Sequence, residues 1–275
     1  MEFEHVSVLL QESVDWLVTD PDGIYVDCTL GGAGHSQKIA SLLSVRGRLI
    51  GIDQDEEALA AAQERLAKAA CRVDIVKANF KDLASVLSRL QVQAVNGVLF
   101  DLGVSSHQLD MAERGFSYMH DGPLDMRMDQ QTEKTAAFVV NTYSEEALAD
   151  LIWRYGEERW HKRIAQFIVL TRQKAPLTTT FQLVDVIKKA IPKGARKDGP
   201  HPAKRTFQAL RIEINDELGI LEQAVDDAIS ALVSGGRIGV ITFQSLEDRI
   251  VKQKLAQLAK GCTCPPHMPL SLIHI

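Results

Sequence analysis

A glycine-rich segment, Asp27–His35, directly follows a β-branched run near the start of the chain. Glycines in this position let the backbone turn tightly and approach a ligand closely. The dinucleotide pattern G-x-G-x-x-G is incomplete, because its third glycine would fall on Gln37 when the pattern starts at Gly32. The sequence also lacks a G-x-x-x-x-G-K-[ST] phosphate loop. The segment therefore predicts a ligand site but disfavours a nicotinamide cofactor and phosphoryl transfer.

Three further positions with functional side chains follow predicted strands. Asp53 comes 19 residues after Gly34, where a carboxylate can accept hydrogen bonds from two ribose hydroxyls. Asn79 and Phe80 follow the next strand and could bracket an adenine, and Asp101 ends the strand after that. Each has a structural explanation when taken alone, such as a turn, a helix cap or a core ring. Their common location at carboxyl ends of strands predicts S-adenosylmethionine, an adenosine without a pyrophosphate.

The elements that position these residues alternate between short β-branched runs and helical patterns, which is typical of βαβ units around a parallel sheet. We expect strands over Ile24–Cys28, Arg48–Asp53, Arg72–Lys77 and Gly97–Leu102, and a fifth after the glycine turn at 234–236. We expect helices over Ser36–Ser44, Glu56–Ala70, Leu83–Leu90 and Leu246–Ala259. The pattern predicts an α/β fold with a doubly wound sheet.

A helical region interrupts this alternation. Residues 132–192 show several amphipathic patterns, and Thr179 is the expected N-cap of a helix that runs through Lys189. Lys193–Arg205 is rich in Gly, Pro and charge and is expected to form an exposed loop, after which the helical pattern resumes over Thr206–Val233. We therefore predict a sheet domain of residues 1–109 and 211–275 with a helical insertion at 110–210.

The net charge of −5 conceals a separation of charge along the chain. Residues 154–212 hold 14 Lys and Arg but only 4 Asp and Glu, a net charge of +10. The rest of the chain then carries 17 of the 31 basic and 32 of the 36 acidic residues, a net charge of −15. A basic segment of this kind predicts an anionic partner such as nucleic acid.

Composition excludes several classes of protein. With 45% hydrophobic and 24% charged residues the chain is neither disordered nor collagen-like. It has no apolar run near the roughly 20 residues of a membrane-spanning helix, so we expect no membrane association. Four cysteines and acids at the N-terminus suit a cytoplasmic protein. Cys262 and Cys264 have no second pair at zinc-ligand spacing, so no metal site is predicted.

Five motifs are specific enough to identify a family. They are Gly31–His35 (GGAGH), Asp101–Gln108 (DLGVSSHQ), Glu113–Met128 (ERGFSYMHDGPLDMRM), Tyr155–Arg163 (YGEERWHKR) and Ser245–Lys252 (SLEDRIVK). Together they closely resemble the RsmH/MraW family of S-adenosylmethionine-dependent methyltransferases, which methylate the exocyclic N4 of a decoding-centre cytidine in 16S ribosomal RNA of the small ribosomal subunit. The resemblance runs from about His5 to Pro266.

The resemblance implies a class I methyltransferase fold with an inserted helical domain that helps to bind RNA. The cofactor contacts that it implies are Ala33, Gly34, His35, Asp53, Phe80, Asp101 and Gln108. As the carboxylate beside the transferred methyl group, Asp101 is the predicted catalytic residue, assisted by Ser105 or Ser106. It would orient a cytosine amine whose lone pair is delocalised into the ring.

The RNA itself must present an unpaired or flipped base. Phe116 and Tyr118 could stack on that base or fasten their loop to the core, and both roles stay open. The predicted phosphate contacts are Arg196, Lys197, Lys204 and Arg205.

Two other interpretations remain. The chain could be a methyltransferase that acts on another nucleic acid such as DNA, although DLGV stands where DNA amino-methyltransferases carry [DSN]-P-P-[YFW]. It could also be an inactive RNA-binding protein, because HMPLSLIHI follows Pro266 where the family continues into a basic segment and a last strand. We expect the usual C-terminal segment to be missing, with an open sheet edge as the consequence. The sequence leaves a homodimer open.

Overall fold

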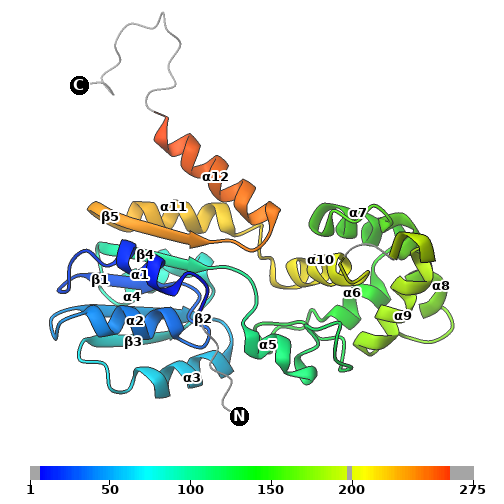
Figure 1. The fold of residues 1–275 in the computed structure, drawn as a ribbon, viewed down its shortest axis with the longest axis horizontal. Helices are drawn as coiled ribbons and strands as arrows, with labels where there is room; N and C mark the ends of the chain where they lie inside the picture. Colours follow the sequence, from blue (N-terminus) through cyan, green and yellow to red (C-terminus); the bar gives the residue numbers. More distant parts are fainter. Residues whose placement is uncertain (1–6, 197–199, 261–275) are drawn as a thin grey trace, which may run out of the picture.

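The computed structural model describes residues 7–196 and 200–260, which form a parallel sheet with helices on both faces and a group of helices beside it (Figure 1). The strands are β1 (Ile24–Asp27), β2 (Arg48–Asp53), β3 (Arg72–Lys77), β4 (Val95–Asp101) and β5 (Leu232–Ile241). They lie in the order β3-β2-β1-β4-β5, and every neighbouring pair is parallel. The predicted doubly wound α/β fold is confirmed.

Alternation of apolar side chains along the strands explains why both faces of the sheet are covered. Tyr25 and Leu99 belong to the core on one face, and Val26, Val98 and Phe100 belong to the core on the other. The first core is completed by α1 (Leu10–Leu17), α2 (Gly34–Leu42) and α3 (Glu56–Leu66). The second is completed by α4 (Leu83–Arg89), α11 (Leu221–Ala231) and α12 (Ser245–Ala259). Successive strand residues point to opposite faces, so continuous apolar runs are the expected signature.

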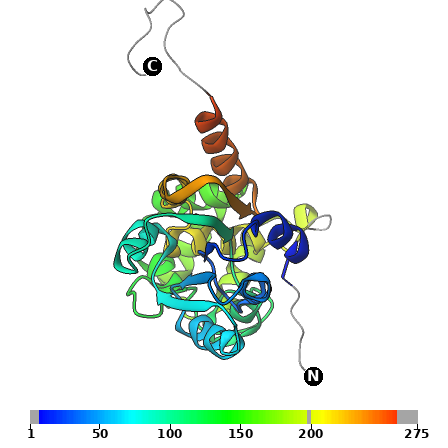
Figure 2. The same cartoon turned by 90° about the vertical axis from the view of Figure 1, so that its left-hand side faces the viewer.

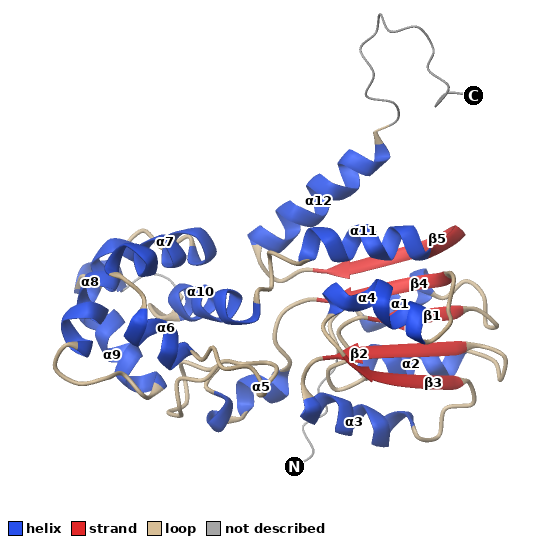
Figure 3. Ribbon diagram, turned by 180° about the vertical axis from the view of Figure 1, so that it is seen from behind, coloured by secondary structure: helices blue, strands red, loops and turns tan. Residues whose placement is uncertain are grey.

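A second group of helices has a core of its own. It contains α6 (Ala136–Thr142), α7 (Glu145–Gly156), α8 (His161–Arg172), α9 (Thr180–Ala190) and α10 (Lys204–Asn215). Its buried residues run from Phe116 to Leu210, inside the predicted insertion. We call these helices the helical unit. The exact domain limits remain a prediction. The carboxyl ends of the strands point toward this unit (Figure 3).

The connections between the two parts contain more helix than the sequence predicts. The short helices α5 (Ser106–Asp110) and η2 (Ala112–Arg114) lie in the Gly- and Ser-rich stretch after β4.

Helix α9 begins as expected, because the Thr179 side chain and Gln182 form a reciprocal capping box. Helix α12 extends away from the sheet at one edge, next to β5, in two views (Figures 1 and 2).

Two helical predictions were wrong in detail. Lys193–Arg205 is not wholly a loop, because η3 (Lys193–Arg196) forms there and α10 begins at Lys204. Phe207 and Leu210 of α10 are buried in the core of the helical unit, and this burial outweighs the helix-breaking composition just before them. Thr206–Val233 is two helices rather than one, because Asp216 adopts a left-handed conformation after α10.

Strand β5 also differs from the prediction, since it begins at Leu232 and runs through the expected glycine turn. A register shift against β4 between Val95 and Gly97 absorbs the extra residues. In the described part of the chain β5 forms one edge of the sheet. No helix within the described ranges is long and apolar enough to cross a membrane.

A candidate active site at the carboxyl ends of the strands

A cavity of about 660 Å³ lies at the carboxyl ends of β1, β2, β3 and β4. Its volume falls in the usual range for small-molecule sites, roughly 300–1,000 Å³. The predicted residues that line it are Gly34, His35, Asp53, Asn79, Phe80, Asp101 and Gln108. The tertiary structure therefore brings together residues that are up to 74 positions apart in the chain. Ala33 is fully buried and is not among the lining residues.

Asp27 anchors the glycine loop through two hydrogen bonds. One carboxylate oxygen accepts a hydrogen bond from the Ser36 hydroxyl at 2.7 Å, and the other accepts one from the Thr29 amide at 3.2 Å. Burial raises the pKa of Asp27 despite these hydrogen bonds. A Cβ atom on Gly34 would lie 2.0 Å from the Ser7 hydroxyl oxygen, so a larger residue would require the Ser7 side chain to move. The loop and residues around Ser7 thus enclose one end of the cavity.

Asp53 keeps hydrogen-bonding capacity for a ligand. Its Oδ2 accepts the Gly31 amide at 2.8 Å and its Oδ1 accepts the Asp55 amide at 2.9 Å. A carboxylate has about four lone-pair sites, so two remain for two hydroxyl groups. Burial raises the pKa of Asp53 to about 6, although both backbone hydrogen bonds act in the opposite direction. The geometry suits a diol such as ribose.

Phe80 presents its ring to the cavity and packs edge-on against Phe100, with 5.9 Å between ring centroids. The neighbouring Asn79 is already engaged, because its amide donates to Gln54 Oε1 at 2.9 Å and its oxygen accepts the Lys81 amide. Both residues line the cavity, Phe80 with its ring and Asn79 with an amide that already forms two hydrogen bonds.

Asp101 lies beside His35 at the end of β4. His35 Nδ1 is 3.5 Å from Asp101 Oδ2, and His35 Nε2 is 3.1 Å from the Val8 carbonyl oxygen. A carbonyl only accepts hydrogen bonds, so Nε2 carries a hydrogen and Nδ1 is the atom that faces the carboxylate. The Asp101 amide donates to the Thr29 hydroxyl at 2.6 Å, which ties β4 to the glycine loop.

Gln108 borders the cavity but uses its side chain structurally. Its Oε1 accepts the Ser105 amide at 3.1 Å while Ser105 Oγ accepts the Gln108 amide, which forms the capping box of α5. Its Nε2 donates to Asp55 Oδ2 at 2.7 Å. Ser105 caps α5 through its Oγ, and both Ser105 and Ser106 line the cavity.

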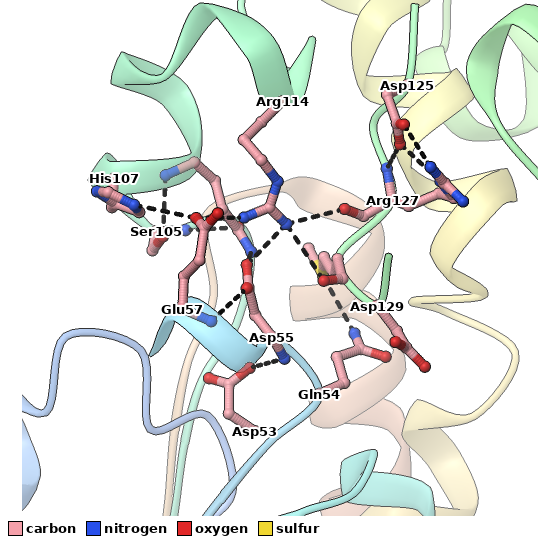
Figure 4. A network of polar contacts seen from close by, with 12 residues as sticks. Asp53, Gln54, Asp55, Glu57, Ser105, His107, Arg114, Asp125, Arg127 and Asp129 are labelled. Carbon is pink, nitrogen blue, oxygen red and sulfur yellow. Dashed lines mark hydrogen bonds and ion pairs between the residues drawn. The ribbon is translucent and has the colours of Figure 1, made fainter. Parts of the chain in front are cut away.

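A buried arginine that the sequence did not single out contacts the turn that follows Asp53 (Figure 4). Arg114 pairs with Asp55 and with Glu57, each at 2.8 Å. Burial would lower the pKa of Arg114, but the two carboxylates outweigh it and leave the pKa above its ordinary value. Arg114 lies in the ERGFSYM string, but nothing in the sequence distinguishes a buried arginine from an exposed one.

Three further lining residues lie outside the predicted set: Phe243, Arg211 and Glu217. Phe243 follows β5 and is 58% exposed, an unusual fraction for a phenylalanine. Arg211 and Glu217 form a two-pronged ion pair, with both N···O distances at 2.8 Å. Burial raises the pKa of Glu217 even against the pull of Arg211. An aromatic ring and hydrogen-bonding groups therefore also border the cavity.

The predicted RNA contacts fall on or next to the helical unit. Arg196 ends η3, Lys204 and Arg205 lie in the first turn of α10, and Lys197 lies outside the described residues. Phe116 is buried in the unit's core, and Tyr118 stacks on His201 with ring centroids 4.6 Å apart. Burial fastens Phe116 to the core, and the contact with His201 links Tyr118 to the start of α10.

Basic side chains in this region share a second property. From Arg154 to Arg205 there are thirteen Lys and Arg, and none of the twelve that the structure describes pairs with a carboxylate. A hollow at the end of α9 is lined by four cations, Lys188, Lys189, Lys193 and Arg196, and by one acid, Asp185. In contrast, the sheet domain neutralises many of its cations, such as Arg48 with Asp74 and Lys77 with Glu56.

No group of three or more metal-binding side chains occurs within residues 7–196 and 200–260. Cys262 and Cys264 lie outside the described residues.

The family model for the MraW methylase family matches residues 2–275. Similar proteins named ribosomal RNA small subunit methyltransferase H occur in Clostridioides difficile, Symbiobacterium thermophilum and Brevibacillus brevis. Each is 57% identical over 270 residues, which cover 98% of this chain and 87%, 85% and 86% of the respective relative. The parallel sheet with its site at the strand ends fits the class I methyltransferase fold that the sequence predicts. The chain belongs to the MraW methylase family.

Proposed function

We propose that this protein uses S-adenosylmethionine to methylate the exocyclic N4 of a decoding-centre cytidine in 16S ribosomal RNA. The names of its relatives support ribosomal RNA of the small subunit as the substrate. The observation that carries the proposal is the shared cavity, in which the glycine loop, Asp53, Phe80 and Asp101 meet below a basic helical unit.

The residues present fit the proposed cofactor. Asp53 has two acceptor sites left for the ribose hydroxyls, and Phe80 offers a ring surface for the adenine. The loop around Gly34 and the carboxylate of Asp101 would enclose the methionine end. When bound, S-adenosylmethionine supplies an electrophilic methyl group on a positively charged sulfur.

Asp101 would act on the nucleophile. The cytosine amine has two hydrogens, and a hydrogen bond to Asp101 orients the amine and stabilises the positive charge that develops on nitrogen. His35 lies beside this carboxylate, with its Nδ1 3.5 Å from Asp101 Oδ2. Ser106, which also lines the cavity, is available to accept or donate one further hydrogen bond.

Phe243 and Arg211, which line the cavity, would contact the base. Phe243 supplies a stacking surface. It follows β5, which stays paired with the end of β4 because the Leu102 amide donates to the Ile241 carbonyl. Arg211 directs Nε and Nη2 to Glu217 and has no bonding partner for Nη1 within the described ranges, which leaves a donor for the ring nitrogen or carbonyl of cytosine. The unpaired cations of the helical unit would contact the RNA backbone.

Methyl transfer to purified small ribosomal subunits, followed by nucleoside analysis, tests this function. We expect N4-methylcytidine to appear at one position and to depend on S-adenosylmethionine. Methylation of another nucleoside, or RNA binding without transfer, would refute it.

Asp101→Asn tests the role of the carboxylate. If Asp101 orients the amine, the variant loses most of its transfer rate while cofactor affinity changes little. A full rate with weakened cofactor binding would restrict Asp101 to holding the cofactor.

A further inference from the structure

Arg114 lies where the chain leaves the sheet domain for the helical unit. Its side chain is 6% exposed, although it carries a permanent charge. A buried guanidinium is tolerated only when carboxylates and carbonyl groups satisfy its donors. The identity of those partners therefore indicates what the arginine holds in place.

The partners come from both sides of the cleft. On the β2–α3 turn, Nη2 contacts Asp55 Oδ2 and Nη1 contacts Glu57 Oε2, each at 2.8 Å. On the segment that enters the helical unit, Nη2 donates to the carbonyl groups of Arg127 at 3.0 Å and Met128 at 3.2 Å. Figure 4 shows Arg114 between these two groups.

The β2–α3 turn also fixes Asp53. The Asp55 amide donates to Asp53 Oδ1 at 2.9 Å, and Asp55 Oδ1 accepts the Glu57 amide at 3.1 Å as the N-cap of α3. The Asp55 carboxylate is itself held by Arg114 and Gln108. A continuous chain of contacts thus runs from the guanidinium through Asp55 to the carboxylate that faces the cavity.

We propose that Arg114 is a positioning residue that sets Asp53 for the cofactor ribose from the helical-unit side of the cleft. This inference rests on the proposed function, because it assigns Asp53 to the ribose. Arg114 does not line the cavity and acts through its two partners on the β2–α3 turn, Asp55 and Glu57. Cofactor affinity therefore depends on a segment, 111–128, that contributes mainly to the helical unit.

The Arg114 cation also affects the electrostatics around Asp53. The negative charge of Asp55 contributes to the raised pKa of Asp53, after burial. Loss of the Arg114 cation removes the group that offsets Asp55 and Glu57, so the pKa of Asp53 rises further. Arg114→Lys keeps the charge and loses the two-pronged geometry, whereas Arg114→Gln loses both.

Arg127 provides a matched control. It lies in the same segment and forms an ion pair with Asp125, at 2.6 Å against 2.8 Å for the Arg114 pairs, but its side chain forms no ion pair or hydrogen bond with the β2–α3 turn. Variants at Arg127 therefore report the general cost of breaking an ion pair in this segment.

The test measures cofactor affinity by calorimetry from pH 5 to pH 8 and amide exchange at residues 53–57 without ligand. We expect Arg114→Lys to weaken cofactor binding about tenfold and to speed exchange of the Asp55 and Glu57 amides. We expect Arg114→Gln, in addition, to move the midpoint of the pH dependence upward. Arg127→Lys and Arg127→Gln should leave affinity, midpoint and exchange unchanged.

A milder variant covers the case in which Arg114 variants do not fold. Glu57→Gln removes one of the two anchors on a side chain that is 43% exposed. It should speed exchange in the same peptide and weaken cofactor binding a few-fold. Unchanged exchange and affinity in Arg114→Lys, or in Glu57→Gln when the former is unfolded, would overturn the inference. Wild-type protein that binds no S-adenosylmethionine would instead overturn the proposed function.

Discussion

At the scale of single residues, the site depends on groups whose environment changes their ordinary chemistry. Asp53 is the clearest example, because burial brings its pKa to about 6 although two amides stabilise its charge. Only the ionised form has two acceptor sites left for two hydroxyls. Its protonation state should therefore control ligand binding near neutral pH.

Cofactor affinity is predicted to fall as pH drops through 6. If only the carboxylate binds the ribose, the Kd at pH 5 is about tenfold higher than above pH 7, because each pH unit below the pKa reduces the ionised fraction about tenfold. Calorimetry across this range checks the prediction, with Asp53→Asn as the control that binds weakly at every pH. A flat profile for the wild type would contradict it.

The same pKa has the opposite consequence for stability. The pKa of Asp53 in the folded state lies above the value of about 3.9 for an unfolded aspartate. This group therefore stabilises the ligand-free fold below about pH 4, and that contribution is lost as pH rises through 6. Cofactor binding and folding thus favour different protonation states of one carboxyl group.

Phe243 is the residue through which base recognition can be tested. Stacking of a base on an aromatic ring contributes about 1–3 kcal/mol. Phe243→Ala is expected to lower kcat/KM for RNA by about 10- to 100-fold without changing cofactor Kd, and Phe243→Tyr should retain most activity.

Phe138 on α6 is the comparison for Phe243, because it is 50% exposed and does not line the cavity. Phe138→Ala should leave the kinetics near wild type. Equal effects of the two alanine variants would show that Phe243 contributes only exposed apolar surface.

At the scale of elements, the segment between β4 and α6 contains little regular structure and depends on close backbone contacts. Gly115 has φ +69°, and a Cβ atom there would lie 2.1 Å from the Pro123 carbonyl oxygen. The Met126 amide donates to the Arg114 carbonyl at 3.0 Å across the same turn. Glycine at position 115 lets the two arms of this turn, residues 114–115 and 123–126, approach each other closely.

Gly115→Ala is therefore expected to destabilise the protein by at least about 2 kcal/mol, since it adds a clash to an unfavourable φ. Gly194→Ala is the matched control, because no atom lies within 4 Å of its added Cβ and its φ is ordinary. Thermal and urea unfolding of both variants measure the difference. Equal stability would mean that the two arms separate without cost.

At the scale of the whole molecule, the separation of charge along the sequence becomes a separation in space. The helical unit carries cations without carboxylate partners, whereas the sheet domain neutralises many of its own. Unpaired cations release counterions on binding a polyanion, and this release makes affinity depend on salt.

Replacing Arg196, Lys204 and Arg205 together by Gln is predicted to weaken RNA binding and flatten its salt dependence. Three lost phosphate contacts should reduce the slope of log K against log salt by roughly 2. Gln at Lys68, Arg89 and Lys260 is the control, since these are exposed, unpaired cations of the sheet domain. An unchanged slope in the first variant would contradict the assignment of these residues to RNA.

The sequence alone determined the sheet and most of the site. Strands Arg48–Asp53 and Arg72–Lys77 were predicted with their observed bounds, because both are short runs with β-branched residues that alternate with helical patterns. Asp53, Phe80 and Asp101 were assigned from their places at strand ends, since parallel strands bring those ends to one edge. The Thr179 cap was likewise a local signal.

Only the tertiary structure revealed the groups that hold or face this edge from the other side. Arg114 and Arg211 come from segments whose approach to the strand ends depends on how the helical unit packs beside the sheet, and Phe243 follows the edge strand β5. The start of α10 at Lys204 depends on burial of Phe207 and Leu210 in that unit. Local spacing encodes which residues share a strand end, whereas burial and pairing across the cleft depend on contacts between distant segments.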